Sequence, residues 1–415
     1  MKLEFPENFY WGSATSSHQV EGNNHNDWTE WEKANADRLA KEAARKEWPD
    51  FILKNYPNSL QEENYISGRA CDHYNRFRED FDIAKQLGHN AHRFSIEWSR
   101  IEPEEGKFDE KEIEHYRQVI LALRERGIEP FVTLWHWTNP IWFAQKGGWL
   151  NKDSPKYFER YTNKITRSLN FVRFWITLNE PDDLYAFRAY FQGIYPPCKH
   201  SILKTWRVLG NLAEVHKRAY KIIHKNNPLA QVGFANNTIY FEAKGFFAKI
   251  VKFFAHWYWN FWFLRKTISY NDFIGCNFYH HNTLKGFKVN QNENKNTSDV
   301  GWEIMPIGIY HVLKYLKKYN KPIYITENGI ADAMDIKRAE YIKEHLKWTH
   351  KAIQEGIDVR GYFHWSLLDN FEWDKGFWPR FGLVEVDYKT MERKIRNSAL
   401  EYKKICQNNA LDTDF

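Results

Sequence analysis

Cysteine is rare in this chain, with four residues among 415, and none of them forms a CxxC pair or shows metal-ligand spacing. The adjacent His280 and His281 resemble a metal pair, but neighbouring residues of a strand face opposite ways. The first residues also lack the basic and apolar segments of a secretory signal. We therefore expect a cytoplasmic protein that holds no metal ion and needs no cofactor.

An excess of charge of one sign is also missing. The chain has 59 basic and 53 acidic residues, a formal net charge of +6, and the small excess is dispersed along the sequence. The longest basic cluster, Lys314, Lys317 and Lys318, has the spacing of a solvated helix face. We expect no nucleic-acid partner.

Long apolar runs are absent as well. The most aromatic stretch, residues 245–264, is interrupted by Lys249, Lys252, His256 and Asn260, whereas a membrane-spanning helix needs about 20 mostly apolar residues. We expect this stretch to form a buried amphipathic helix, and we expect no membrane partner. A helix lying at a membrane interface is the alternative that the sequence leaves open.

No linker rich in proline, glycine or serine divides the chain, and 43% of its residues are hydrophobic, enough for a large core. Short strand-like runs recur instead, and several are apolar at successive positions, as in strands covered on both faces. The eight runs are residues 9–15, 91–97, 129–136, 174–180, 231–236, 272–279, 322–328 and 359–366.

Helical patterns separate these runs. Residues 80–88, 113–127 and 307–319 place apolar side chains at helical spacing, and the first two stretches end on a glycine. Strands alternating with helices in this number predict an α/β fold: one (β/α)8 TIM barrel domain over residues 1–415, with elaborated βα loops. Residues 38–64 predict a mostly helical extension of its rim. A doubly wound open sheet is the main alternative, but no glycine-rich phosphate turn follows the first strand.

Polar and aromatic residues gather where the predicted strands end. Two carboxyl groups are the most conspicuous, since Glu180 closes the fourth strand and Glu327 lies at the end of the seventh, each beside an asparagine. In a barrel the carboxyl ends of the strands meet on the face that carries active sites. The other candidates at or shortly after these ends are Gln19, Arg93, His136, Trp137, Asn179, Asn277, Tyr279, Trp365, Glu372 and Trp373.

Six motifs at these positions resemble glycoside hydrolase family 1, the family of retaining β-glucosidases and β-galactosidases. They are FYWGSAT at 9–15, RFSIEWSR at 93–100, TLWHW at 133–137, TLNEP at 177–181, ITENG at 325–329 and WSLLDNFEW at 365–373. They follow the family's order and extend over nearly the whole chain. The resemblance implies a hydrolase whose partners are small β-glycosides or short oligosaccharides.

Hydrolysis of a glycosidic bond needs a proton for the leaving oxygen and a partner for the cationic anomeric carbon, which two carboxyl groups can supply. The resemblance implies that Glu180 is the acid and then the base, that Glu327 is the nucleophile, and that configuration is retained. Two close carboxylates raise the pKa of one of them. Arg93, which by resemblance lies beside Glu327, would keep Glu327 ionised.

The resemblance also implies supporting roles. Arg93, Asn277 and Tyr279 would support the two carboxyl groups, and Asn179 would hold the 2-hydroxyl of the sugar. The residues implied to bind the sugar are Gln19, His136, Trp137, Trp365, Glu372, Trp373 and Phe381.

Two other functions compete with this one. A 6-phospho-β-glycosidase typically has serine at the position of Glu372 and lysine and tyrosine where this chain has Pro379 and Phe381, and a carboxylate at 372 would repel a phosphate. A carbohydrate-binding pseudoenzyme would lose one of the two carboxyl groups, and both are present. The sequence leaves open the choice among glucosides, galactosides and fucosides, and the choice between hydrolysis and transglycosylation.

Overall fold

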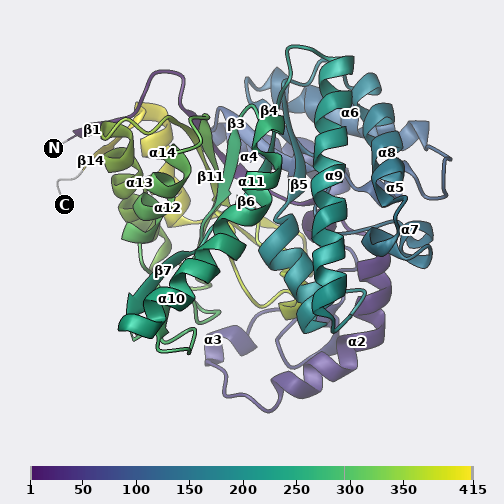
Figure 1. The fold of residues 1–415 in the computed structure, drawn as a ribbon. Coiled ribbons are helices and arrows are strands. Elements are labelled where there is room, and N and C mark those ends of the chain that lie inside the picture. Colours follow the sequence, from purple (N-terminus) through teal and green to yellow (C-terminus); the bar gives the residue numbers. More distant parts are fainter. Residues whose placement is uncertain (1, 294, 413–415) are drawn as a thin grey trace.

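The computed structural model describes residues 2–293 and 295–412, and its centre is a closed barrel of eight parallel strands (Figure 1). This confirms the predicted fold class, and each strand overlaps one of the predicted runs. The strands are β2 Tyr10–Ala14, β3 Ala91–Ser95, β4 Glu129–Thr133, β5 Phe174–Asn179, β6 Gln231–Asn237, β8 Ile274–Asn277, β10 Ile323–Asn328 and β11 Val359–Trp365.

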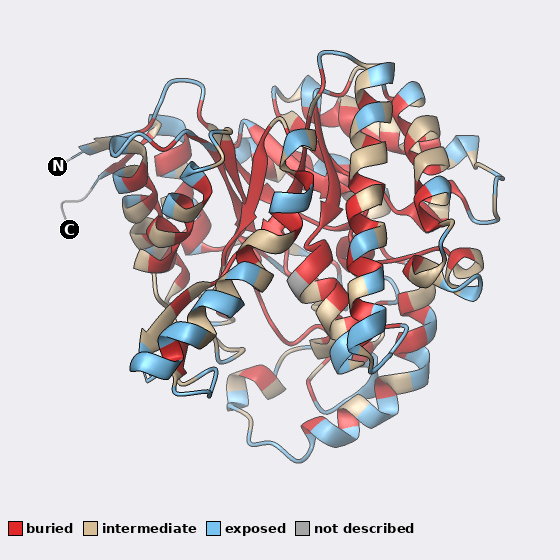
Figure 2. Ribbon diagram, viewed as in Figure 1, coloured by how far each residue is buried: buried red, intermediate tan, exposed pale blue. Residues whose placement is uncertain are grey.

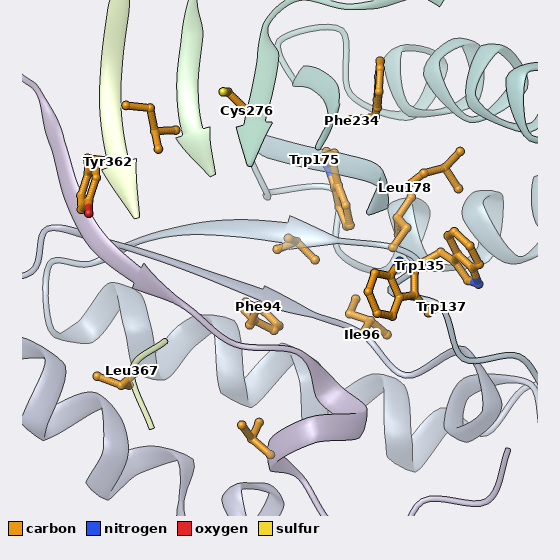
Figure 3. Packing of buried hydrophobic residues seen from close by; sticks show 14 of the residues in the cluster. Phe94, Ile96, Trp135, Trp137, Trp175, Leu178, Phe234, Cys276, Tyr362 and Leu367 are labelled. Carbon is orange, nitrogen blue, oxygen red and sulfur yellow. The ribbon is translucent and has the colours of Figure 1, made fainter. Parts of the chain in front are cut away.

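Apolar side chains leave these strands on both faces. On β5, Phe174 and Ile176 belong to the cluster that fills the barrel, while Trp175 belongs to the larger cluster outside it. Phe174 stacks on Phe131 of β4 with ring centroids 4.1 Å apart. Figure 3 shows members of the outer cluster, Trp175 and Phe234 among them, close to the strands and helices. Burial on two faces explains why these strands are apolar at successive positions.

Helices surround the barrel, with buried faces toward the strands and exposed faces outward (Figure 2). Three of them confirm helices predicted from the sequence: α4 His73–Gln86, α6 Glu110–Glu125 and α12 Ile307–Lys317. The others of this layer are α8 Ser154–Ser168, α9 Ile202–Asn226, α11 Phe263–Thr267, α13 Arg338–Gln354 and α14 Asn397–Asn408.

Further strands and helices lie outside the barrel and this helix layer. Three pairs of strands lie outside it: β1 Lys2–Glu4 with β14 Ala410–Asp412, β7 Tyr240–Lys244 with β9 His281–Lys285, and β12 Val384–Val386 with β13 Arg393–Ile395. The remaining helices are α1 Ser17–Val20, α2 Asp27–Ala43, α3 Asp50–Leu53, α5 Trp98–Ile101, α7 Ile141–Gln145 and α10 Phe246–Ala255. Two segments are π-helical, Pro181–Gln192 and His256–Trp262. Four short 3-10 helices are Glu62–Tyr65, Gly148–Leu150, Ile268–Tyr270 and Trp373–Lys375.

Two sequence predictions about these outer segments are wrong. Residues 38–64 are helical only in part, in the end of α2, in α3 and in one 3-10 turn, because irregular segments separate these pieces. Residues 245–264 are helical, but most aromatic side chains of α10 are exposed rather than buried, because only the opposite side of the helix packs on β7 and β9. Within residues 2–293 and 295–412, none of the helices has the length and apolar character that crossing a membrane requires.

A buried cluster of charges fixes the chain after β11. Arg396 donates hydrogen bonds to both carboxylate oxygens of Asp369, at 2.9 and 2.8 Å, and Arg380 lies 3.4 Å from one of them. Burial by itself would raise the pKa of Asp369, but the two guanidinium groups outweigh it and hold the pKa below its ordinary value. Asp369 belongs to the WSLLDNFEW segment, so this cluster helps to hold Trp365 and Trp373 in place.

We expect Asp369→Asn to lower the free energy of unfolding by about 3–5 kcal/mol, because two buried guanidinium groups lose their counter-charge. Denaturant titration followed by tryptophan fluorescence measures the change. The control is Asp358→Asn, which removes the exposed ion pair with Arg360 and should cost less than about 1 kcal/mol. Equal losses in the two variants would contradict the structural importance of the Asp369 cluster.

Candidate active site

A cavity of about 600 Å³ opens at the carboxyl ends of the barrel strands. Most of the residues predicted from the sequence line it: Gln19, His136, Trp137, Asn179, Glu180, Tyr279, Glu327, Trp365, Glu372, Trp373 and Phe381. Arg93 and Asn277 lie just beneath, in contact with the two glutamates. Residues far apart in the sequence are thus brought together because each follows or ends a strand of one closed barrel.

Glu180 occupies the first position after β5 and has a backbone φ of +43°. Asn277 donates a hydrogen bond of 2.8 Å from Nδ2 to Glu180 Oε1. Burial and the nearby negative charge of Glu327 raise the pKa of Glu180 well above its ordinary value. The side chain is therefore held as a neutral acid that faces the cavity.

Glu327, at the end of β10, has a different environment. Arg93 Nη1 donates to Oε1 at 2.6 Å, and the hydroxyl of Tyr279 donates to Oε2 at 2.6 Å. Burial raises the pKa of Glu327, but the charge of Arg93 and the Tyr279 hydrogen bond act against that rise. A proton shared by the pair consequently resides on Glu180, and the negative charge resides on Glu327.

Arg93 is the junction of this network. It is buried on β3, and beside Glu327 it contacts Asn179 of β5, whose Oδ1 accepts a 2.6 Å hydrogen bond from Nη2. Asn277 of β8 donates to the same oxygen at 3.3 Å. One cation therefore fixes the relative positions of side chains from four strands.

The hydrogen bonds of Asn179 determine which ring nitrogen of His136 carries the proton. Asn179 Oδ1 is occupied by Arg93, so the amide nitrogen points to His136 Nε2, 3.1 Å away, and the ring proton lies on Nδ1. Burial, assisted by the charge of Arg93, holds the pKa of His136 well below its ordinary value. Nδ1 is buried and has no hydrogen-bond partner among the described residues, so the neutral ring keeps one N–H group unpaired.

Another part of the cavity lining combines polar side chains, Gln19 and Glu372, with indole rings. Gln19 Nε2 donates to the carbonyl of Phe371 at 2.8 Å and lies 3.3 Å from a carboxylate oxygen of Glu372. Burial raises the pKa of Glu372 to about 7. The ring of Trp373 lies 4.7 Å from that of Trp137, centroid to centroid. Flat aromatic faces beside buried polar groups suit a ligand with both hydroxyl groups and C–H faces.

Positive backbone φ angles recur at this site. Trp137, Glu180 and Trp373 have φ values of +75°, +43° and +53°, in a region that residues other than glycine rarely adopt. Each costs on the order of 1–3 kcal/mol and persists where the surrounding structure holds it. The chain turns sharply at these points and directs the side chains into the cavity.

Gly329, directly after β10, shows why the ITENG segment ends on glycine. A Cβ atom at this position would lie 1.8 Å from the carbonyl oxygen of Trp365, at the end of β11. Only a residue without a side chain permits these two strand ends to approach so closely. Gly329 therefore brings the segment that carries Glu327 against the segment that carries Trp365.

Several lining residues were not identified from the sequence. Asn237 closes β6 as Asn179 closes β5, so the same strand-end criterion could have found it. Others come from the two π-helical segments or from a loop, where strand periodicity gives no signal. These are Leu184, Phe187, Arg188, Trp259 and Trp302.

His280 and His281 both border the cavity, and their rings have different neighbours, Trp302 for His280 and Tyr240 for His281. His280 precedes β9, which begins at His281. His281 Nε2 lies 3.0 Å from a carboxylate oxygen of Glu303. Across the described ranges, no three or more histidine, cysteine or acidic side chains form a group that could hold a metal ion.

Known proteins are similar to this chain in fold and in sequence. A β-glycosidase from Pyrococcus horikoshii superposes with a TM-score of 0.88 at 38% identity, over 99% of this chain and 97% of that one. Beta-glucosidase A from Thermotoga maritima is 35% identical over 99% of both chains. A β-galactosidase from Sulfolobus acidocaldarius is 33% identical over 81% of this chain and 84% of its own.

The Thermotoga maritima β-glucosidase has also been solved in complex with castanospermine and with deoxynojirimycin, and it superposes on this chain with a TM-score of 0.86. The model of glycosyl hydrolase family 1 matches residues 1–245 and 262–411. The match leaves only a short internal segment and the last residues uncovered. The chain therefore belongs to glycosyl hydrolase family 1 and is a β-glucosidase-like glycoside hydrolase.

Proposed function

We propose that this protein is a retaining, exo-acting β-glycosidase that hydrolyses terminal β-D-glucosides, and β-D-galactosides and fucosides as well, through a covalent glycosyl-enzyme. The observation that carries the proposal is the unequal environment of the two buried glutamates. Glu180 is kept neutral by burial and by its neighbour, whereas Glu327 receives hydrogen bonds from Arg93 and Tyr279. One acid and one carboxylate at a single sugar ring are what a double displacement requires.

In the first step, Glu327 attacks the anomeric carbon while Glu180 gives its proton to the glycosidic oxygen, and the C–O bond to the leaving alcohol breaks. Glu327 becomes a neutral ester. The loss of its charge lowers the pKa of Glu180, now a carboxylate, which can accept a proton from water. That water attacks the same carbon, the ester bond breaks, and both glutamates return to their starting states.

The sugar would be held by groups that are already oriented. His136 lines the cavity, and the amide of Asn179, which Arg93 holds in place, would contact the 2-hydroxyl group of the sugar. Gln19 and Glu372 offer a fork for the hydroxyl groups at the far end of the ring. The remaining proposed sugar contacts are the faces of Trp137, Trp365, Trp373 and Phe381.

The substrate class rests on the relatives and on the cavity. Relatives named β-glucosidase and β-galactosidase support small β-glycosides as substrates. A 6-phosphate is disfavoured because the buried carboxyl group of Glu372 lies at the end of the site where it would bind. A pseudoenzyme is disfavoured because both glutamates face one cavity. We also propose a cytoplasmic location, in keeping with the buried free thiols of Cys71, Cys276 and Cys406.

We expect Glu180→Gln to slow hydrolysis of glycosides with poor leaving groups by about 10²–10⁴-fold, since general acid catalysis is lost. The rate of the first step should fall less for activated nitrophenyl glycosides. Added azide should restore their turnover and yield a β-glycosyl azide. Glu327→Gln is the matched comparison: it should abolish turnover, and azide should not restore a β-configured product. Absence of azide rescue in Glu180→Gln would count against its acid/base role.

Retention can be observed directly. Proton NMR of the first product formed from a nitrophenyl β-glucoside should show the β-anomer before mutarotation, because two inversions at one carbon restore the configuration. The wild-type protein and fresh substrate suffice for this measurement. Initial release of the α-anomer would exclude the covalent intermediate on Glu327.

Glu327→Gln should also lower the pKa of Glu180, because it removes the neighbouring negative charge that disfavours ionisation of Glu180. This neutral variant resembles the electrostatic state of the glycosyl-enzyme. The pKa can be measured by ¹³C NMR titration of glutamate carboxyl groups, with the Glu180→Gln/Glu327→Gln double variant to assign the signal. A pKa of Glu180 that stays the same or rises would refute the coupling of the two groups.

A further inference from the structure

Aromatic side chains project from the outer face of α10 into solvent. Four phenylalanines of the helix and one from the turn after β9 form what we call the aromatic surface. Their exposed fractions are 73% for Phe246, 55% for Phe247, 68% for Phe253, 61% for Phe254 and 76% for Phe287. Single exposed apolar residues are common, but a contiguous group of this kind indicates an interaction site.

The spacing along α10 places these side chains on one side. Phe246, Ile250 and Phe253 of α10, and Trp257 of the π-helical segment that follows, recur at intervals of three or four residues, and all four are exposed. Ala248 is buried on the opposite side, against Phe241 of β7 and Leu284 of β9. Figure 2 shows α10 at the lower left with exposed residues along its outward side. The helix is anchored on one side and presents its second apolar side outward.

This helix lies in a segment that the family model does not match. The family model matches residues 1–245 and resumes at 262, so α10 lies in the unmatched segment. The catalytic network of Arg93, Glu180 and Glu327 involves none of its residues. The exposed aromatic rings are therefore not explained by the barrel or by its chemistry.

The positive charges around the aromatic surface indicate what binds to it. Lys249 and Lys252 are the charged residues of α10, which contains no acidic residue. The turn after β9 adds Lys288 next to Phe287, whose ring lies 5.5 Å from that of Phe247. Phenylalanines bordered by lysines match the composition of helices that lie in the surface of membranes with anionic lipids. In a symmetric contact between two copies, by contrast, the same lysines would face each other without a carboxylate on the helix.

We propose that the aromatic surface docks this protein on anionic lipid membranes, with α10 lying in the interface and its phenylalanines inserted among the headgroups. The protein would rest on the bilayer and would not span it, in keeping with the length of α10. Ile239 and Trp259 contact the underside of this helix and also line the cavity. Docking consequently places the entrance of the cavity beside the lipid surface.

The test is co-sedimentation of the full chain with vesicles of phosphatidylcholine alone or mixed with phosphatidylglycerol. We expect binding to the mixed vesicles that weakens with added salt. Phe246→Ser/Phe253→Ser/Phe254→Ser should weaken it by about tenfold or more, because three apolar anchors are removed. Lys249→Glu/Lys252→Glu should remove the preference for phosphatidylglycerol.

The matched control is Leu229→Ser/Ile336→Ser, which removes apolar residues that are as exposed but lie elsewhere, at 84% and 75%. This control should bind vesicles like the wild-type protein. All these variants should keep wild-type hydrolysis of a nitrophenyl glycoside, which shows that they fold. Because the vesicle assay measures binding, its outcome is independent of the proposed catalytic roles.

Three results would overturn the proposal. The wild-type protein could stay in the supernatant with phosphatidylglycerol vesicles at low salt, or the triple phenylalanine variant could bind as tightly as the wild type. The third result is a dimer in analytical ultracentrifugation that the triple variant abolishes, without vesicle binding by either protein. That result would identify a second copy of the chain as the occupant of the aromatic surface.

Discussion

The ion pair between Arg93 and Glu327 determines the electrostatics of the whole site. Both groups are buried, and a charge removed from water is costly unless a partner compensates it. Arg93 compensates Glu327 and leaves Glu180 without such a partner, so the two glutamates differ although both are buried side chains of the same type. The same guanidinium orients Asn179, and through it His136. Replacement of this one cation would disturb protonation and geometry together.

The barrel supplies the constraint that makes this pairing possible. Arg93 is on β3, Asn179 on β5 and Glu327 on β10, and these strands are not neighbours in the barrel. Their side chains meet because the closed sheet directs the strand ends toward one axis. Trp137, Glu180 and Trp373 have positive φ angles, and all three line the cavity. The rigid frame offsets this local strain.

The chain combines this family core with a separate outer feature. Ile239 and Trp259 line the cavity and pack against α10, whereas Glu180 and Glu327 also line the cavity and Arg93 lies beneath them. If α10 docks on membranes as proposed, a change at this helix would alter where the protein acts without altering the reaction itself. This division follows from the architecture, because strands fix the inner end of the site and inserted loops form its entrance.

The sequence by itself determined the eight strands, the barrel and most of the residues around the cavity, because strand periodicity and the six motifs are local properties of the chain. Prediction from the sequence failed where the environment of a residue depends on which other segments pack against it. The helix at 246–255 has an apolar pattern that fits burial or exposure equally well, and only the packed structure shows that its aromatic face is uncovered. Likewise Trp259 reaches the cavity from a π-helical segment and Trp302 from a loop. The location of the proton on Glu180 was decided by distances to Arg93 and Tyr279, since electrostatic free energies depend on separation and burial, which exist only in the folded chain.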